Sequence, residues 1–556
     1  MSIEATGSSG GRTRRRRALR GLAVLVTAAV MVAACGDDDS STGGTGGSDP
    51  ATTAAGGTST SPPSSAGDEV DDADVDPDGV VRIAYDLAAL GGVRLDPVES
   101  VNTADVALQW LIYGTLLRRN LEGEYEPGLA ESAEIVDPST LRVTLREGLR
   151  FSDGTPLDAE VLKASIERII ASENGRVFYA EIRQVQEMVV ESDTVLTIRL
   201  AKPIAGWFLE LLASNETFAM PPVPEGQLAT QPVGAGPFKF ESLTPERSLK
   251  LVKNPDYWDA DNVKLAGVEF VHATAGQAQV NALRSGAVDY ATLDPSLLSS
   301  LQGTGLEVAE LPTNNSLVWF QICKTDPPFD DVRVRQALVY ALDREAMNEA
   351  LAGGKGEPMT GMWRSDHRLY NPDLRGAYPH DPDRARALLA EAGQENLRFD
   401  LYTTAAPTGA RFTEIAQQQW AEIGVTVNLL TTSNILEDFF TNHRAPMATV
   451  QLIAVGLNKV TRNFVTGSIG NVCQYDDPTL NQLVADVQAT REDSDEAVER
   501  WAPLQQFIFD EALSIFGIFL TQGAAWDPDR VGGVEISTDH AGRLILDVES
   551  AYIKAR

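Results

Sequence analysis

The sequence of 556 residues contains only three cysteines and five histidines, and it has 46 basic residues against 79 acidic ones. So little cysteine excludes a disulfide-rich scaffold and an array of zinc ribbons. The formal net charge is −33, whereas a protein that binds nucleic acid needs a basic surface for the phosphates. Nucleic acid is therefore excluded as a main partner. The histidines are scattered and show no HExxH or other close pairing. We therefore expect neither a metal nor a cofactor.

The common sequence signatures of catalysis are also missing. The one G-x-S-x-G pattern, Gly7–Gly11, lies close to the N-terminus and not on a strand-to-helix turn. The glycine-rich stretch Gly353–Pro358 lacks the spacing of a phosphate-binding loop and follows a predicted helix instead of preceding one. We expect no catalytic residues and no enzymatic activity.

Long hydrophobic runs are absent, apart from a short one near the start. It covers Gly21–Ala34, and its 14 residues are fewer than the 18 or more that a single-pass helix needs. Six arginines precede or adjoin it, so the run predicts the apolar core of a secretory signal over residues 1–34. The stretch VAAC that ends at Cys35 resembles a bacterial lipobox. We expect Cys35 to be the lipidated first residue of the mature chain; the alternative is a signal peptide in which Cys35 is incidental.

A polar segment follows over residues 35–78. It is rich in glycine, serine, threonine and proline, and it has 11 acidic residues and no basic one. Such a composition cannot bury enough apolar surface to fold, which predicts a disordered acidic tether. Without the leader the chain has 40 basic and 78 acidic residues, a balance of −38. Subtracting the 11 acidic residues of the tether leaves −27, so the body beyond the tether is itself acidic. No later stretch reaches 18 uninterrupted apolar residues, and we expect lipid alone to hold the body at the membrane.

From Val80 onward, strand and helix patterns alternate. Apolar residues at every second position predict strands over Val80–Tyr85, Ser139–Leu145 and Gly424–Leu430. Apolar stripes at helical spacing follow three candidate N-caps, Asp158, Asp343 and Asp381. Gly353 and Gly393 stand where the second and third of these helices should end. The interleaving predicts an α/β fold rather than a helix bundle or a β-sandwich.

Seven short motifs occur in order along this body. They are YEPGLAES (Tyr125–Ser132), TLREGLRFSDGTPLDAE (Thr144–Glu160), VGAGPFKF (Val233–Phe240), NPDYWD (Asn254–Asp259), DPPFDDVRVRQALVYALD (Asp326–Asp343), DPDRARALLAEAG (Asp381–Gly393) and AEIGVTVNL (Ala421–Leu429). Their glycines suit turns and their acidic residues suit helix caps, so most of them are expected to be scaffold. In this order and spacing they resemble the extracellular solute-binding proteins of family 5, the peptide-, nickel- and opine-binding components of ABC importers.

The resemblance implies a two-lobed α/β fold of the periplasmic-binding-protein type (type II, flytrap-like) with an enlarged first lobe. The ligand would be enclosed as the lobes close on a hinge. The first lobe would comprise residues 79–312 together with 523–556, and the second lobe residues 313–522. The chain would cross between the lobes near Leu311–Asn315 and again near Gln522.

Candidate cleft residues follow from positions that match the family. The segment after the turn Leu95–Pro97, an aromatic residue after the first long helix and the crossover segment all run towards the ligand in such proteins. The resemblance therefore implies ligand contacts for Asn102, Thr103, Tyr179, Asn314 and Asn315. Core packing is the alternative for Tyr179, and the asparagines could instead satisfy loop backbone.

One stretch departs from the family pattern. Peptide-binding relatives have an acidic residue within a tryptophan-flanked run of the second lobe, where the carboxylate neutralises the α-ammonium of the peptide. Here Leu452–Phe464 contains no acid, and Gly456, Leu457 and Asn458 stand at the matching place, followed by Lys459. We expect the cleft to suit a neutral or anionic solute better than a peptide selected by its free amino group.

The two remaining cysteines, Cys323 and Cys473, both fall within the implied second lobe. After lipidation of Cys35 they are the only thiols left in an oxidising compartment, so we predict a disulfide between them. The alternative is two separately buried free cysteines.

The resemblance implies a substrate-binding protein of an ABC importer at the extracytoplasmic face of the bacterial cell membrane. It would capture a small solute, peptide-like or other, and deliver it to permease subunits that a separate ATPase drives. We expect a monomer, with contacts to its ligand, the permease and, through its lipid, the membrane. Two alternatives stay open, a surface receptor or adhesion protein without a transport role and a lipid-anchored hydrolase.

Overall fold

The structure is a computed structural model that describes residues 72–88, 92–100, 103–120, 124–172, 181–404, 406–453, 463–468, 470–538 and 544–555. All of the described residues belong to one compact unit, which spans residues 68–556. The predicted signal segment, Cys35 and residues 36–71 of the predicted tether lie outside the described residues.

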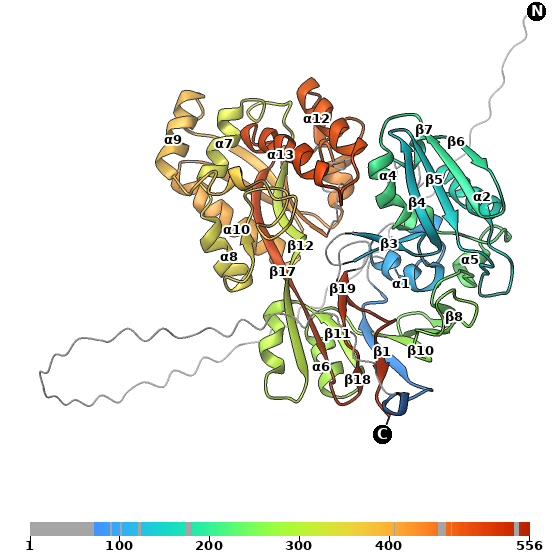
Figure 1. The fold of residues 1–556 in the computed structure, drawn as a ribbon. Helices are drawn as coiled ribbons and strands as arrows, with labels where there is room; N and C mark the ends of the chain where they lie inside the picture. The colour runs from blue at the N-terminus through green and yellow to red at the C-terminus, as the bar shows by residue number, and fades with distance from the viewer. Residues whose placement is uncertain are drawn as a thin grey trace, which may run out of the picture. The chain divides into compact units, whose positions relative to one another are not determined.

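A mixed sheet of eleven strands forms the framework of this unit (Figure 1). Its order is β15-β14-β16-β12-β17-β11-β1-β10-β9-β8, with β13 beside β17. The strands are β1 (Val80–Tyr85), β8 (Phe238–Thr244), β9 (Ser248–Lys253), β10 (Gly267–His272), β11 (Tyr290–Leu293), β12 (Glu307–Ile322), β13 (Glu357–Pro358), β14 (Arg398–Thr403), β15 (Thr426–Thr431), β16 (Met447–Ile453) and β17 (Ile515–Trp526). The strand order thus puts β14 to β16 on one side of β12 and β17, and β1 with β8 to β11 on the other.

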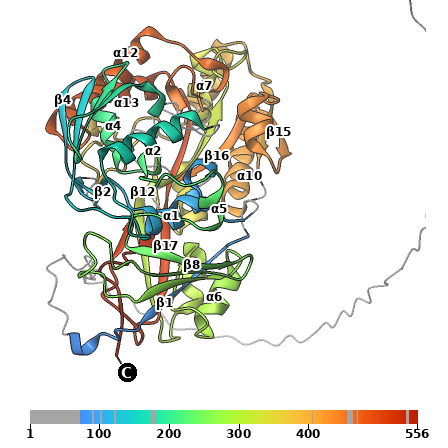
Figure 2. The ribbon, with the colours of Figure 1, turned by 90° about the vertical axis from the view of Figure 1, so that its right-hand side faces the viewer.

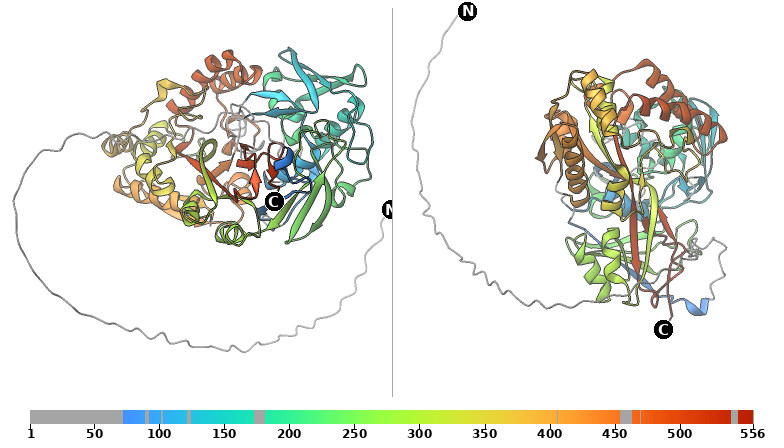
Figure 3. Two further views of the ribbon diagram at one scale, coloured as in Figure 1. Left: turned by 60° about the horizontal axis from the view of Figure 1, so that its bottom comes forward. Right: turned by 90° about the vertical axis from the view of Figure 1, so that its left-hand side faces the viewer.

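Two long antiparallel strands, β12 and β17, connect the two halves of the sheet. Residues Glu307–Pro312 of β12 pair with Thr521–Trp526 of β17, and pairing resumes at Leu317 opposite Phe519. Towards one end β17 also pairs with β11, whereas β12 pairs with β16 towards the other. Figure 3 shows the two strands running side by side through the molecule. The chain therefore crosses between the halves twice, once along each strand.

Smaller sheets are attached to this framework. A four-stranded antiparallel sheet has the order β4-β5-β7-β6, and three two-stranded sheets pair β2 with β3, β18 with β21 and β19 with β20. Their strands are β2 (Leu117–Arg119), β3 (Tyr125–Pro127), β4 (Ala130–Asp137), β5 (Thr140–Leu145), β6 (Val185–Val190), β7 (Val195–Leu200), β18 (Val531–Gly532), β19 (Ile536–Thr538), β20 (Leu544–Leu546) and β21 (Tyr552–Ile553).

Helices cover the sheets. The α-helices are α1 (Thr103–Tyr113), α2 (Ala159–Ala171), α4 (Ala205–Leu212), α5 (Gln227–Thr230), α6 (Gln277–Arg284), α7 (Val332–Tyr340), α8 (Arg344–Ala352), α9 (Pro382–Glu391), α10 (Pro407–Glu422), α12 (Pro478–Ala489) and α13 (Asp495–Asp510). Short 3-10 turns occupy Asp72–Asp74, Pro97–Glu99, Ile182–Gln184, Asn215–Thr217, Pro295–Leu301, Pro372–Leu374 and Val472–Gln474, and Leu436–Thr441 is a π-helix. Within the described ranges, no helix combines the length and the apolar character needed to cross a membrane.

The local predictions are confirmed. The three aspartate caps each accept a backbone N–H at 2.9 Å, Asp158 from Val161, Asp343 from Ala346 and Asp381 from Arg384. Gly353 and Gly393 have φ values of 57° and 69°, the left-handed conformation that ends a helix at low cost in glycine. The predicted strands correspond to β1, β5 and β15 with bounds within two residues. The α/β fold class is confirmed as well.

The C-terminal segment packs on the half of the sheet that contains β1. Asp289, whose side chain is fully buried, accepts from Arg82 Nη2 of β1 and from Arg530 Nε, both at 2.6 Å. Val75 and Lys554 form an antiparallel bridge near the C-terminus. These contacts tie the last strands of the chain to its first described strand.

Candidate ligand-binding site

The predicted crossover residues lie in an irregular part of β12. Between Pro312 and Leu317 the pairing of β12 with β17 shifts register, opposite Thr521 and Phe519. Such an irregularity bends a strand and takes backbone groups out of the ladder. Asn314 and Asn315 therefore lie at the bend where the chain passes from one half of the sheet to the other. The positions of their side chains are outside what the structure describes.

The other predicted cleft positions are only partly described. Thr103 is the first residue of α1, and the predicted contacts Asn102, Tyr179, Gly456, Leu457 and Asn458 lie outside the described residues. The turn that leads towards α1 is held firmly, because the buried carboxylate of Asp96 accepts from Arg168 Nη2 at 2.6 Å. This ion pair thus holds the turn before α1 in place. The ligand contacts of Asn102, Thr103 and Tyr179 stay predictions.

A small apolar cavity adjoins the segment that departs from the family pattern. It is lined by Leu317, Trp319, Met359, Met362, Asn463, Phe464, Ser514 and Phe516. Its volume of about 10 Å³ is close to what one water molecule requires.

Gln321 of β12 anchors the chain that follows this segment. Its Nε2 donates to Gly470 O at 2.7 Å, while its Oε1 accepts from Ser514 Oγ at 3.1 Å and from Trp319 Nε1 at 3.3 Å. Because Gln321 and Ser514 are buried, these bonds satisfy groups that water cannot reach.

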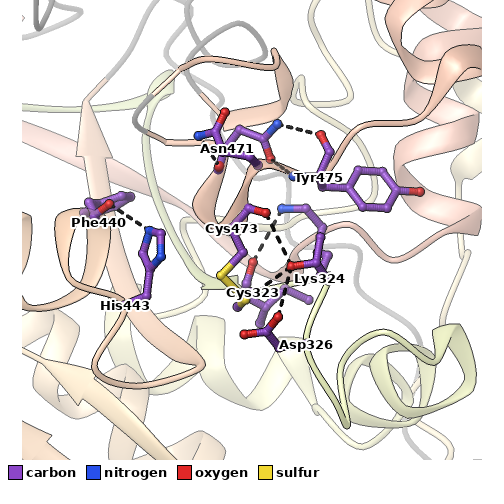
Figure 4. Close-up of a disulfide and its surroundings, with 11 residues drawn as sticks. Cys323, Lys324, Asp326, Phe440, His443, Asn471, Cys473 and Tyr475 are labelled. Atoms are coloured by element: carbon purple, nitrogen blue, oxygen red, sulfur yellow. Dashed lines mark hydrogen bonds between the residues drawn. A yellow bond between two sulfur atoms is a disulfide. The ribbon is translucent and has the colours of Figure 1, made fainter.

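The disulfide fastens the same region a second time. Cys323 and Cys473 are bonded, with Cα atoms 5.3 Å apart, a separation within the range that disulfides need (Figure 4). Among the described residues, Cys323, Cys473 and Asp326 are the one group of side chains close enough to share a metal ion. Since the two sulfur atoms are bonded to each other, neither offers the thiolate that metal binding requires.

Lys324 is a fully buried lysine next to the disulfide. Its Nζ lies 3.5 Å from Ile322 O and 5.7 Å from the centre of the Phe464 ring. Burial, with the positive charge of Arg335 as the second cause, lowers the pKa of Lys324 to about 7. The amine therefore titrates near neutral pH. The sequence contained no sign of this, because lysines are mostly exposed and burial depends on the elements packed around them.

The NPDYWD motif is scaffold, as its sequence suggested. Tyr257 OH donates to Glu549 Oε1 at 2.7 Å and accepts from Arg118 Nη2 at 3.0 Å. Two guanidinium groups lie over the ring of Trp258. The guanidinium carbon of Arg118 is 5.1 Å from the ring centre, and that of Arg146 is 3.7 Å from it. The motif thus joins β2 to the C-terminal segment.

The sequence and the fold together identify the class of protein. A sequence model of bacterial extracellular solute-binding proteins, family 5, matches residues 124–458, and the chain belongs to this family. The fold is the two-lobed one of periplasmic binding proteins, and the related proteins are solute-binding proteins rather than enzymes.

Particular relatives include the glutathione-binding protein GsiB of several enteric bacteria. The chain is 26% identical to GsiB of Salmonella paratyphi A over 347 residues, and 27% identical to GsiB of Escherichia coli K12 over 343 residues. Each match covers 60% of this chain and 66% of the relative, slightly less than two thirds of the relative's length.

Solved structures share the fold. The murein tripeptide binding protein MppA of Escherichia coli superposes with a TM-score of 0.70 at 19% identity, covering 87% of this chain and all of that chain. CtaP of Listeria monocytogenes gives 0.72 at 23% identity, covering 86% of this chain and all of that chain. DppA of Helicobacter pylori, solved with the peptide STSA, gives 0.71 at 19% identity, with 86% of this chain and 98% of that chain covered.

Proposed function

We propose that this protein is the substrate-binding component of an ABC importer. It captures a small solute between its two lobes at the extracytoplasmic face of the membrane and delivers it to permease subunits that a separate ATPase drives. The observation that supports this most strongly is the match of the family across residues 124–458, the stretch that includes the crossover strand β12. We propose that the protein acts as a monomer.

The proposed lobes follow the two halves of the main sheet. The first comprises residues 79–312 with 523–556, and the second comprises residues 313–522. The register shift of β12 after Pro312, and the passage of β17 from β13 to β11, support boundaries at these places. β12 and β17 continue through both proposed lobes. When the lobes move, a few residues of these strands would change their backbone angles and act as the hinge.

The proposed anchor is a lipid on Cys35. The apolar run before it is too short to span a bilayer, and the residues after it are acidic and polar. A flexible segment of this kind lets the folded part meet a permease while it stays attached to the same membrane.

The proposed ligand is a small neutral or anionic solute. Burying an ammonium group costs several kcal/mol unless a carboxylate or oriented carbonyls compensate, and Leu452–Phe464 contains no acid. Glutathione, the ligand named for the relatives, has two carboxylates and one α-ammonium group, so its net charge at neutral pH is negative. Its carboxylates fit the proposed ligand class and its ammonium does not, so it is the first compound to test.

Mass spectrometry of the purified protein tests the proposal. Under native conditions we expect a mass increment from a retained small solute, and denaturation should release it for identification. Ligand-free protein should then bind the identified solute, or glutathione, in a calorimetric titration. If no solute is retained and neither glutathione nor a library of small metabolites binds, the proposed function is wrong.

A further inference from the structure

A turn of the proposed second lobe touches the proposed first lobe at β2 and β3, outside the two strands that cross between the lobes. The turn Thr490–Asp493 joins α12 to α13. Arg119 Nη2 of β2 lies 2.6 Å from Glu492 Oε1, and the backbone N–H of Tyr125 in β3 lies 3.5 Å from Asp493 Oδ2. Figure 2 shows α4 and α12 on the same side of the molecule, and the residue that starts the turn lies against Gly206 of α4. We call Arg119, Tyr125, Gly206 and Thr490–Asp493 the seam contact.

Each side of the seam contact is built into its own lobe. Arg368 Nη1 donates to Glu492 O at 2.8 Å, which holds the turn to the second lobe. On the other side Ala205 N donates to Pro138 O at 2.9 Å, which joins the start of α4 to the four-stranded sheet. Each surface therefore has a contact to its own lobe that does not cross the seam.

The charges of the seam contact are well matched but costly to bury. The side chains of Arg119 and Glu492 are only 13% and 8% exposed. Burial is the largest single effect and opposes the charge of Arg119. The combined effects of Glu492, Tyr125 and Glu210 outweigh burial and raise the pKa of Arg119, so the guanidinium stays charged. Desolvation of a buried ion pair cancels much of its attraction. When the surfaces separate, both ions regain water, so the pair favours contact by only a small net free energy.

Tyr125 adds an aromatic link between the two sides. The guanidinium carbon of Arg119, from the first lobe, lies 5.6 Å from the centre of the ring, and that of Arg491, from the second lobe, lies 5.8 Å from it. Arg491 is held in place by Asp493, with Nη2 and Oδ2 2.7 Å apart. One aromatic ring thus interacts with a cation from each lobe.

The backbones of the two lobes also come very close. A Cβ atom added at Gly206 would lie 2.3 Å from the carbonyl carbon and oxygen of Thr490. No side chain fits there without displacement of backbone. Gly206 is the second residue of α4, where alanine would otherwise favour the helix.

Some polar atoms of the seam contact are left unsatisfied. Arg119 Nη1, Tyr125 OH and Glu492 Oε2 are buried and find no hydrogen-bond partner among the described residues. In a permanent interface each such atom would cost free energy, whereas on separation water satisfies all of them. This balance suits a contact that opens and closes.

We propose that the seam contact is a latch for the closed form of the protein. It forms when the lobes close over a solute and it sets how long they stay closed, although none of its residues contacts the solute. The proposal rests on the proposed function, because a latch needs two lobes that move.

Hydrogen–deuterium exchange of the purified full-length protein in detergent tests the latch without any ligand. The peptide that contains Tyr125 reports the contact directly, because its N–H points to Asp493. Glu492→Gln removes the charge and keeps the shape, and Gly206→Ala inserts a methyl group and keeps every charge. Because Glu492→Gln weakens the ion pair and Gly206→Ala forces the two backbones apart, we expect both variants to raise the exchange rate of this peptide about tenfold.

Matched controls separate the latch from general destabilisation. Asp438→Asn removes a 2.6 Å ion pair with Arg444 inside the second lobe. Gly409→Ala adds a methyl group in α10, and the nearest atom to it, Thr449 Cγ2, would be 3.8 Å away, which is an ordinary van der Waals contact. Neither control should change exchange at Tyr125. If both seam variants exchange like the unaltered protein at Tyr125, or if both also exchange faster in β1 and β14, the seam is a fixed interface and the latch proposal is overturned.

A second arm separates this proposal from the function itself. With glutathione added, the unaltered protein should protect the Tyr125 peptide, and the two seam variants should protect it less. Binding of glutathione without any change in this protection overturns the latch. Failure to bind glutathione or any retained solute counts against the proposed function alone, because the ligand-free comparison of the variants does not depend on it.

Discussion

Cys323 at the end of β12 and Cys473 in the chain that follows residues 463–468 are joined by a disulfide, although 150 positions separate them in sequence. The bond fastens the strand that crosses between the halves of the sheet to the loop that continues from the predicted cleft segment. Gln321 reaches the same loop by a hydrogen bond to Gly470 O. The end of the predicted ligand-binding segment is therefore held by both a covalent bond and a buried polar network.

We predict that removing the disulfide destabilises the protein without preventing its folding. The double variant Cys323→Ser/Cys473→Ser should lose up to about 5 kcal/mol of unfolding free energy, the chain-entropy figure for a loop of about 150 residues. Urea unfolding measures this loss. Thiol titration of the denatured, unreduced protein should find neither Cys323 nor Cys473 free, and two reactive thiols there would show that the bond does not form.

We predict that Lys324 makes stability depend on pH. Its folded pKa is about 7, whereas a lysine in the unfolded chain titrates near 10.4. Between these values the unfolded state binds more protons, so stability rises with pH from about 7 upward. The cost of the buried charge is fully present below pH 7.

Lys324→Met should therefore stabilise the protein more at pH 6.5 than at pH 9.5, by a difference of roughly 3 kcal/mol in unfolding free energy. Urea unfolding at the two pH values measures the difference. Lys355→Met is the control, because Lys355 is 65% exposed and pairs with Glu310 at the surface. If Lys324→Met stabilises the protein equally at both pH values, the prediction that burial lowers the pKa of Lys324 is wrong.

We predict that Cys35 is the lipidated residue. Cys35→Ser should release the protein into the medium, because the thiol is the only group at that position that can be acylated before cleavage. Immunoblots of washed membranes and culture medium measure the distribution. If the variant stays bound after an alkaline carbonate wash, the anchor is something else.

We predict that the protein does not select peptides through a free α-amino group. Calorimetric titration with di- to pentapeptides and with their N-acetylated counterparts tests this. The two sets should bind alike or not at all, because Leu452–Phe464 has no carboxylate to neutralise an ammonium and includes Lys459. Micromolar binding that acetylation abolishes would mean that an acid from another loop takes this role.

Local structure could be predicted from the sequence because its causes are local. The caps Asp158, Asp343 and Asp381 each bond an N–H only three residues ahead, and Gly353 and Gly393 end helices by their own backbone conformation. The disulfide pairing followed from the absence of any other thiol outside the lipobox. The order of the motifs led to the family and so to the fold.

Contacts between distant residues were decided by the tertiary structure alone. Nothing near Arg119 in sequence indicates Glu492, which lies 373 residues further on, and nothing near Lys324 indicates its burial. The strand order that joins β12 to β17 brings such residues together, and water exclusion by the surrounding elements then sets their charge energies. Local sequence determined where helices and strands begin and end, whereas packing determined which charged groups meet and what their burial costs.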